Sequence, residues 1–207
     1  TLTRLHEALD GALAFVSGRS LSAIDRLFAP LSTAAVGCHG AEIRGADGRV
    51  TALTDPIPHS VRDFFQSLAD AYPGTMLEDK LYSLALHYRL APDARPALDA
   101  AVKAQQSLLA AEKVVVRSGK AVIDVKRLGI DKGTGVRALM REPPFLGRAP
   151  VFGGDDTTDA DVFRILPELG GHGFSVGKAF EGAAYEFPSP RDVRQWLANL
   201  AEAGVAA

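Results

Sequence analysis

The feature that most constrains this fold is a pair of short apolar segments. Each ends at glycine or serine, and a helical segment separates them. Residues 12–16 form an apolar run that ends at Ser17 and Gly18. Residues 21–28 then repeat apolar side chains at helical spacing, and residues 34–36 form a second short apolar run. Buried parallel strands are short and continuously apolar. The order strand, helix, strand therefore predicts an α/β layer.

The middle of the chain predicts a different architecture. Two β-rich runs flank Ser118-Gly119, a pattern typical of a hairpin, and helical segments precede them. The α/β pattern returns near Ile130. We therefore expect a core of residues 1–57 and 127–207, interrupted by an α+β domain of residues 58–126.

Bulk composition excludes several classes of protein. The net charge of −2 provides no global attraction to nucleic acid, and no apolar run approaches the ~20 residues of a membrane-spanning helix. With one cysteine, Cys38, the chain forms no internal disulfide, which suits a reducing compartment. We expect a cytoplasmic monomer that binds neither nucleic acid nor membrane.

The strongest candidate site is an acidic turn. Asp155, Asp156, Asp159 and Asp161 fall within seven positions, directly after the apolar run at Val151-Phe152. Ligands of open α/β sheets bind beyond the carboxyl ends of strands, and clustered carboxylates suit a hard cation such as Mg²⁺. A helix start enriched in acids explains the same residues without a metal.

Two weaker candidates lie at other predicted turns. Ser17, followed by Gly18, ends a strand and can offer hydrogen bonds to a phosphate, although a helix-capping serine is the simpler reading. Lys132 opens a predicted helix, where the dipole disfavours a cation unless an anion pairs with it. Most lysines are simply solvated, so both alternatives stay open.

Polar residues also gather on the predicted strands of the middle segment. They suit a pocket for a hydroxyl-rich ligand, or equally the solvated face of a sheet. The residues are Glu78, Lys80, His87, Arg89 and Asp124.

Five stretches together resemble the trehalose-6-phosphate phosphatase family of the haloacid dehalogenase-like (HAD) superfamily. They cover nearly the whole chain and occur in the expected order: residues 16–20, residues 39–42 with Arg44, residues 78–80 with 83–89, residues 131–133, and residues 154–159. The resemblance implies a Rossmann-like α/β core with a parallel sheet and an inserted α+β cap. It also implies hydrolysis of trehalose 6-phosphate through an aspartyl-phosphate intermediate, with Mg²⁺ as cofactor.

The resemblance further implies individual roles. Ser17, Lys132, Asp156 and Asp159 take part in catalysis, and Asp155 and Asp156 bind Mg²⁺. Seven residues are expected to contact the sugar-phosphate substrate: Arg19, His39, Glu42, Arg44, Glu78, Lys80 and Asp124.

Three departures from the family pattern matter. The Asp-x-Asp-Gly-Thr motif of the nucleophile does not occur in these 207 residues, and we expect it on a central strand encoded before Leu2. Asp124 stands where the family usually has glutamate, and Arg127 where it usually has proline. The alternatives are a phosphatase of another sugar phosphate, or a relative that binds a phosphosugar without turnover.

Overall fold

Two compact units make up the protein in this computed structural model, which describes residues 1–203. The core unit comprises Thr1–Leu53 together with the segment from Asp131 onward, and the inserted unit comprises Thr54–Ile130. The expected insertion, residues 58–126, is thus four residues shorter at each end than the observed one, since 58 compares with 54 and 126 with 130.

The first half of the core unit builds a four-stranded sheet in the order β1-β2-β3-β4. Its elements are α1 (Leu2–Ala8), β1 (Ala14–Val16), α2 (Leu21–Phe28), β2 (Ala34–Gly37), β3 (Glu42–Arg44) and β4 (Val50–Ala52). Strands β1 and β2 are parallel, whereas β3 and β4 add an antiparallel extension.

The second half of the core unit builds a three-stranded parallel sheet in the order β11-β10-β9. Its elements are α6 (Lys132–Leu139), β9 (Val151–Gly154), α7 (Ala160–Phe163), β10 (His172–Val176), β11 (Tyr185–Phe187) and α8 (Pro190–Ala203). Three short 3₁₀ turns complete the core unit: Cys38–Gly40, Thr157–Asp159 and Pro167–Leu169.

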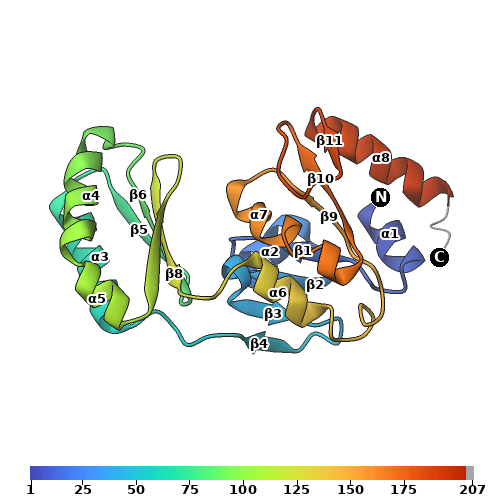
Figure 1. The fold of residues 1–207 in the computed structure, drawn as a ribbon, viewed down its shortest axis with the longest axis horizontal. Coiled ribbons are helices and arrows are strands. Elements are labelled where there is room, and N and C mark those ends of the chain that lie inside the picture. Colours follow the sequence, from blue (N-terminus) through green and yellow to red (C-terminus); the bar gives the residue numbers. More distant parts are fainter. Residues whose placement is uncertain (204–207) are drawn as a thin grey trace. The chain divides into compact units, whose positions relative to one another are not determined.

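The side chains of β2 point alternately to the two faces of the first sheet, and helices cover both faces (Figure 1). Ala35 packs with Leu21 and Ile24 of α2, while Ala34 and Val36 pack with Leu139 of α6. Successive side chains of a strand point to opposite faces, so a fully buried strand needs apolar residues on both.

Strands β1 and β9 are both edge strands, and both line one apolar groove of about 790 Å³. Ala14 and Val16 contribute from β1, Phe152 from β9, and Trp196 from α8. Val16 and Phe152 also pack against the same buried cluster around Phe163. Within residues 1–203, each of these edges therefore presents backbone groups without a strand partner to a shared apolar space.

The inserted unit is an antiparallel sheet with helices on one face. The sheet order is β5-β6-β8-β7. Its elements are α3 (His59–Ala71), β5 (Met76–Asp79), β6 (Ser83–His87), a 3₁₀ turn (Pro92–Ala94), α4 (Arg95–Ala104), α5 (Gln106–Ala111), β7 (Val114–Ser118) and β8 (Val122–Arg127). Leu84, Leu86 and Val125 bury one face of the sheet against Phe65 and Leu98.

None of the helices in the described part of the chain combines the length and apolar character needed to cross a membrane.

Candidate functional site

The acidic turn after β9 is organised by Asp159. Asp155 and Asp156 are exposed, whereas Asp159 is only 4% exposed. Its Oδ2 accepts hydrogen bonds of 2.9 Å from the backbone N–H groups of both Asp155 and Asp156. Two backbone donors to one buried carboxylate fix the loop that presents the two exposed carboxylates.

Lys132 pairs with the other oxygen of Asp159. The Lys132 Nζ lies 2.6 Å from Asp159 Oδ1, and both side chains are buried. Lys132 is the first residue of α6, whose start is fixed by a capping box: Thr134 N–H donates to Asp131 Oδ1, and Thr134 Oγ1 accepts from Asp131 N–H. A cation that the helix dipole disfavours is thus compensated by a buried carboxylate.

Asp156 is held ionised by its neighbours. Its carboxylate accepts hydrogen bonds from the N–H of Thr157 and the hydroxyl of Thr158. Burial by itself raises the pKa of Asp156, but these hydrogen bonds and the charge of Lys132 outweigh that effect, so the pKa lies below its ordinary value. Asp156 is therefore a carboxylate at neutral pH.

Asp155 has no hydrogen bond or ion pair at its carboxylate within residues 1–203. No group of three or more His, Cys, Asp or Glu side chains in the described part of the chain lies close enough together to hold a metal ion. Mg²⁺, however, is commonly held by one or two carboxylates while keeping several waters. Asp155, with Asp156 beside it, offers a donor set of that kind.

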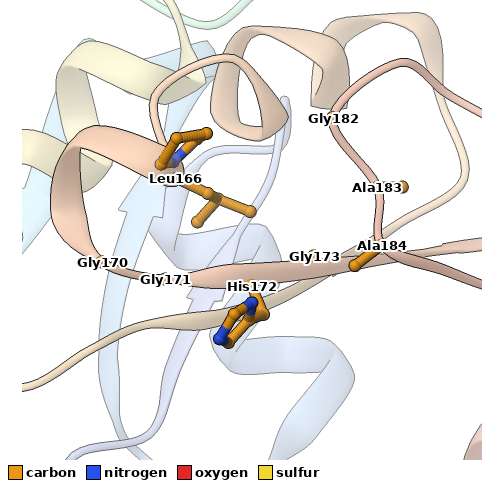
Figure 2. A pocket seen from close by; sticks show the side chains of 9 residues that line it. Leu166, Gly170, Gly171, His172, Gly173, Gly182, Ala183 and Ala184 are labelled. Atoms are coloured by element: carbon orange, nitrogen blue, oxygen red, sulfur yellow. The ribbon is translucent and has the colours of Figure 1, made fainter.

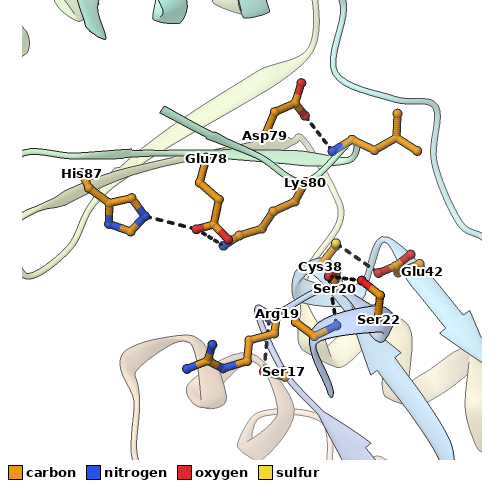
Figure 3. Close-up of polar contacts among 12 residues, drawn as sticks. Ser17, Arg19, Ser20, Ser22, Cys38, Glu42, Glu78, Asp79, Lys80 and His87 are labelled. Carbon is orange, nitrogen blue, oxygen red and sulfur yellow. Dashed lines mark hydrogen bonds and ion pairs between the residues drawn. The ribbon is translucent and has the colours of Figure 1, made fainter. Parts of the chain in front are cut away.

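The turn after β1 carries the second candidate group. Ser17 Oγ accepts the N–H of Arg19 at 3.1 Å, and the Ser17 carbonyl accepts the N–H of His39 at 3.1 Å. Figure 3 shows this turn beside the Cys38–Glu42 contact. The Arg19 side chain is exposed, while Ser17 and His39 are half-buried. The hydroxyl, the guanidinium and the imidazole thus come from two turns that are joined by backbone hydrogen bonds.

Close backbone contacts connect these turns to Lys132. A Cβ on Gly40 would overlap the carbonyl of Asp131, and a Cβ on Gly133 would overlap the carbonyl of Asp161. Only glycine allows such close approach of two backbones. The turn at residues 38–40 therefore lies against the start of α6, which in turn lies against the acidic turn.

Gly40 makes a test of this packing possible. We expect Gly40→Ala to lower the free energy of unfolding by about 1–3 kcal/mol, because the new methyl meets the Asp131 carbonyl at a φ of +104°. The control is Gly48→Ala, where φ is also positive, at +81°, but no atom lies within 4 Å of the added Cβ. Denaturant unfolding should show a larger loss for Gly40→Ala; equal losses would mean that the close contact contributes nothing.

Glu42 and Arg44 of β3 are engaged inside the core unit. Glu42 Oε1 accepts the N–H of Leu21, the first residue of α2, at 2.8 Å. Arg44 donates to Asp25 of α2 at 2.8 Å and to the carbonyl of Thr33 at 2.9 Å. These contacts tie β3 to α2 and give both residues a structural role. Their contact with substrate stays a prediction.

In the inserted unit, Glu78 is the centre of a charged cluster (Figure 3). Its Oε2 lies 3.1 Å from His87 Nε2 and 3.4 Å from Lys80 Nζ. Burial raises the pKa of Glu78, but the bond from His87 and the charge of Lys80 outweigh that effect and lower the pKa below its ordinary value. A carboxylate and an ammonium side by side can accept from and donate to neighbouring hydroxyls.

Strand register places Asp124 on the same face of this sheet. Glu78 is opposite Ala85, and Ala85 is opposite Asp124. Directly opposed residues share a face, so Glu78 and Asp124 lie on one side of the sheet with Ala85 between them. Two further residues on this face were not predicted as site residues: Ser83, which is 3% exposed, and Lys126, which is 7% exposed and directly opposite it.

A separate cavity of about 500 Å³ lies at the start of β10 and contains none of the predicted residues. Figure 2 shows its lining, which includes Leu166, His172 and Ala183. Because β9 and β10 are parallel, the start of β10 lies at the opposite sheet end from the acidic turn. The cavity therefore lies at the other end of the strands and is separate from the candidate site.

Solved structures show the same arrangement of elements. The C-terminal domain of Candida albicans trehalose-6-phosphate phosphatase matches with a TM-score of 0.75 at 24% identity, covering 97% of this chain and 83% of that one. A Bacillus subtilis haloacid dehalogenase-like hydrolase matches with a TM-score of 0.66 at 14% identity, covering 97% and 91%. The fold is that of the haloacid dehalogenase-like hydrolases, as the sequence predicted.

Comparison with sequence relatives shows to which family of these hydrolases the chain belongs. The model of the trehalose-phosphatase family matches residues 1–183. Trehalose-6-phosphate phosphatase of Escherichia coli is 37% identical over 204 residues, covering 98% of this chain and 76% of that protein. A probable trehalose-phosphate phosphatase of Sinorhizobium fredii is 35% identical over 205 residues, covering 97% and 77%. The chain belongs to the trehalose-phosphatase family.

Proposed function

We propose that this chain is the greater part of an enzyme that hydrolyses trehalose 6-phosphate to trehalose and phosphate. The observation that carries the proposal is the 37% identity to the Escherichia coli trehalose-6-phosphate phosphatase across 98% of the chain. The cluster of Lys132, Asp155, Asp156 and Asp159 supports it, because clustered carboxylates with one buried lysine suit a phosphoryl group and a divalent cation.

The proposed chemistry divides the work among these residues. Mg²⁺, held by Asp155 and Asp156, would neutralise charge on the phosphoryl group. Ser17 would donate to a phosphoryl oxygen, and Lys132 would hold Asp159, which in turn holds the acidic turn in place. An aspartate would attack phosphorus to form an aspartyl-phosphate, while the bond from phosphorus to the sugar oxygen breaks and trehalose leaves with a proton on that oxygen. Water would then hydrolyse the aspartyl-phosphate, releasing phosphate and restoring the aspartate.

The attacking aspartate would come from outside these 207 residues. We propose that it lies on a strand between β1 and β9, because both are edge strands that line one apolar groove. A strand placed there would satisfy the free backbone groups of both edges and bury its apolar side chains. Its carboxyl end would then reach the turns after β1 and β9.

Phosphate release tests the proposal. We expect the protein that includes the preceding coding sequence to release phosphate from trehalose 6-phosphate in Mg²⁺, and to release far less from glucose 6-phosphate or in EDTA. Trehalose 6-phosphate carries a second sugar unit that glucose 6-phosphate lacks, and the proposed specificity depends on the hydroxyls of that unit. Equal rates on the two substrates would contradict the proposed specificity.

A second candidate function is a module that binds a phosphosugar without turnover. The observation that favours it is the lack of an Asp-x-Asp-Gly-Thr motif within residues 1–207. Sequencing the coding DNA upstream of Thr1 distinguishes the two: a strand that ends in this motif supports the enzyme, and a reading frame without it supports the binding module.

A further inference from the structure

The hydroxyl of Ser83 is buried without a partner on the polar face of the inserted unit. Ser83 is 3% exposed, and its Oγ makes no hydrogen bond within residues 1–203. Its backbone carbonyl accepts the N–H of Lys80 at 2.9 Å. A buried hydroxyl that lacks a hydrogen-bond partner is destabilising. A ligand that supplies the missing hydrogen bond removes this cost, so the surroundings of Ser83 are a candidate binding site.

Two rows of side chains surround this hydroxyl. Ser83 is opposite Lys126 on β8, and the bond from Lys80 N–H continues the register on the β5 side. The next row consists of Glu78, Ala85 and Asp124. In the first row, Ser83 therefore lies between two lysines, Lys80 and Lys126. In the next row, Ala85 lies between two carboxylate side chains, those of Glu78 and Asp124.

This arrangement matches a ligand rich in hydroxyls. Strand β6 contributes only the short side chains of Ser83 and Ala85 to the middle of the face, whereas its neighbours contribute long charged ones. A sugar ring above β6 would have hydrogen-bond donors in the first row and acceptors in the second. The apolar residues Leu84 and Leu86 of β6 face the helices instead.

We propose that Ser83 is a direct ligand of a hydroxyl group of the sugar, and that this bond satisfies the Ser83 Oγ. The proposal rests on the proposed function, because it assigns the polar face to the sugar part of that substrate. Within this face, Ser83 differs from Glu78 and Lys80 in having no competing partner to give up.

Ser83→Ala separates this role from a structural one. We expect the affinity for trehalose, measured by calorimetry, to fall about three- to ten-fold, as for the loss of one neutral hydrogen bond. The melting temperature should not fall, because the mutation removes a hydroxyl that had no partner. A lower melting temperature with unchanged affinity for trehalose would assign Ser83 to structure and overturn the proposal.

The matched control is Ser67→Ala on α3, whose hydroxyl is exposed and already donates to the Phe64 carbonyl at 2.7 Å. It should leave the affinity for trehalose unchanged. Inhibition by inorganic phosphate, which lacks sugar hydroxyls, should be the same in Ser83→Ala and the wild type. A loss of phosphate affinity as large as the loss of trehalose affinity would contradict a sugar-specific role.

The same experiment keeps the two proposals distinct. A wild-type protein that binds trehalose but releases no phosphate from trehalose 6-phosphate would defeat the proposed function and leave the Ser83 comparison valid. A wild type that turns over trehalose 6-phosphate, with a Ser83→Ala variant of equal KM and equal trehalose affinity, would defeat only the role of Ser83.

Discussion

Replacing Lys132 by methionine is expected to lower the free energy of unfolding by about 3–5 kcal/mol. The ammonium lies 2.6 Å from Asp159 Oδ1, and the two side chains are only 7% and 6% exposed. Methionine fills a similar volume but leaves the Asp159 carboxylate buried without a cation. Denaturant unfolding measures the loss, and phosphate release should fall with it, because Asp159 holds the turn that carries Asp155 and Asp156.

A second substitution distinguishes the buried charge from a loss of packing. Adding Asp159→Asn to Lys132→Met removes the uncompensated carboxylate, while the amide oxygen can still accept from the backbone of the acidic turn. We expect the double variant to recover part of the lost stability and none of the activity. If it is no more stable than Lys132→Met, the burial of an unpaired charge is not the cause.

An exposed ion pair on the same helix provides the matched control. Arg137 of α6 pairs with Glu168 at 2.5 Å, and their side chains are 34% and 60% exposed. Arg137→Met removes a cation from the same element, but solvent screens the pair, so the cost should stay within about 1 kcal/mol. Equal costs for the two variants would contradict a special role for burial at Lys132.

Local sequence signals predicted the alternating elements of the core unit, because each depends on a few neighbouring residues. The run before Ser17 became β1, and the helical face that follows became α2. Ser20 accepts the N–H of Ala23 at the start of α2, as a capping serine does. The short strands β3, β4 and β11 were not predicted, since their three residues carry too little periodicity to be seen without their partners.

In the inserted unit, the local sequence did not predict where one of the helices ends. The alanine-rich sequence of residues 97–112 predicts one helix, but the chain breaks at Gln105 into α4 and α5. No glycine or proline marks the break. Leu98 and Leu109 bury in the same cluster on either side of it, which indicates that packing on the sheet, a tertiary effect, decides the direction of the chain.

The hairpin turn was predicted at Ser118-Gly119, and it lies two residues later, at Lys120-Ala121. Ser118 still pairs with Ile123, and Gly119 N–H bonds the Val122 carbonyl at 2.8 Å. Ala121 takes a positive φ of 60°. A non-glycine residue in this conformation is uncommon, so the sequence carried no signal for the actual position of the turn.

Contacts within the candidate site were less predictable than its residues. The acidic turn stands out because four carboxylates follow one apolar strand. The pair of Lys132 and Asp159 joins residues 27 positions apart, and no spacing rule connects them. Ser83 and Lys126 were missed because their shared face follows only from the register of β6 and β8.

Asp155→Asn is expected to reduce Mg²⁺-dependent phosphate release at least about a hundred-fold while leaving the fold intact. The Asp155 carboxylate is exposed and makes no hydrogen bond or ion pair within the described residues 1–203, so its charge contributes no contact that the amide would lose. Removing a negative charge next to Asp156 also relieves repulsion. The melting temperature should therefore stay equal or rise slightly, the opposite of what we expect for Lys132→Met.

Turnover as a function of Mg²⁺ concentration shows whether the lost activity is a loss of metal binding. If Asp155 is a ligand, more Mg²⁺ should be needed for half-maximal activity, and the binding isotherm for the metal alone should weaken in parallel. Glu7→Gln removes an equal charge from an exposed position on α1 and should change neither quantity. Undiminished Mg²⁺-dependent turnover in Asp155→Asn would remove Asp155 from the metal site and leave Asp156 as the carboxylate to test, since its low pKa keeps it charged beside Lys132.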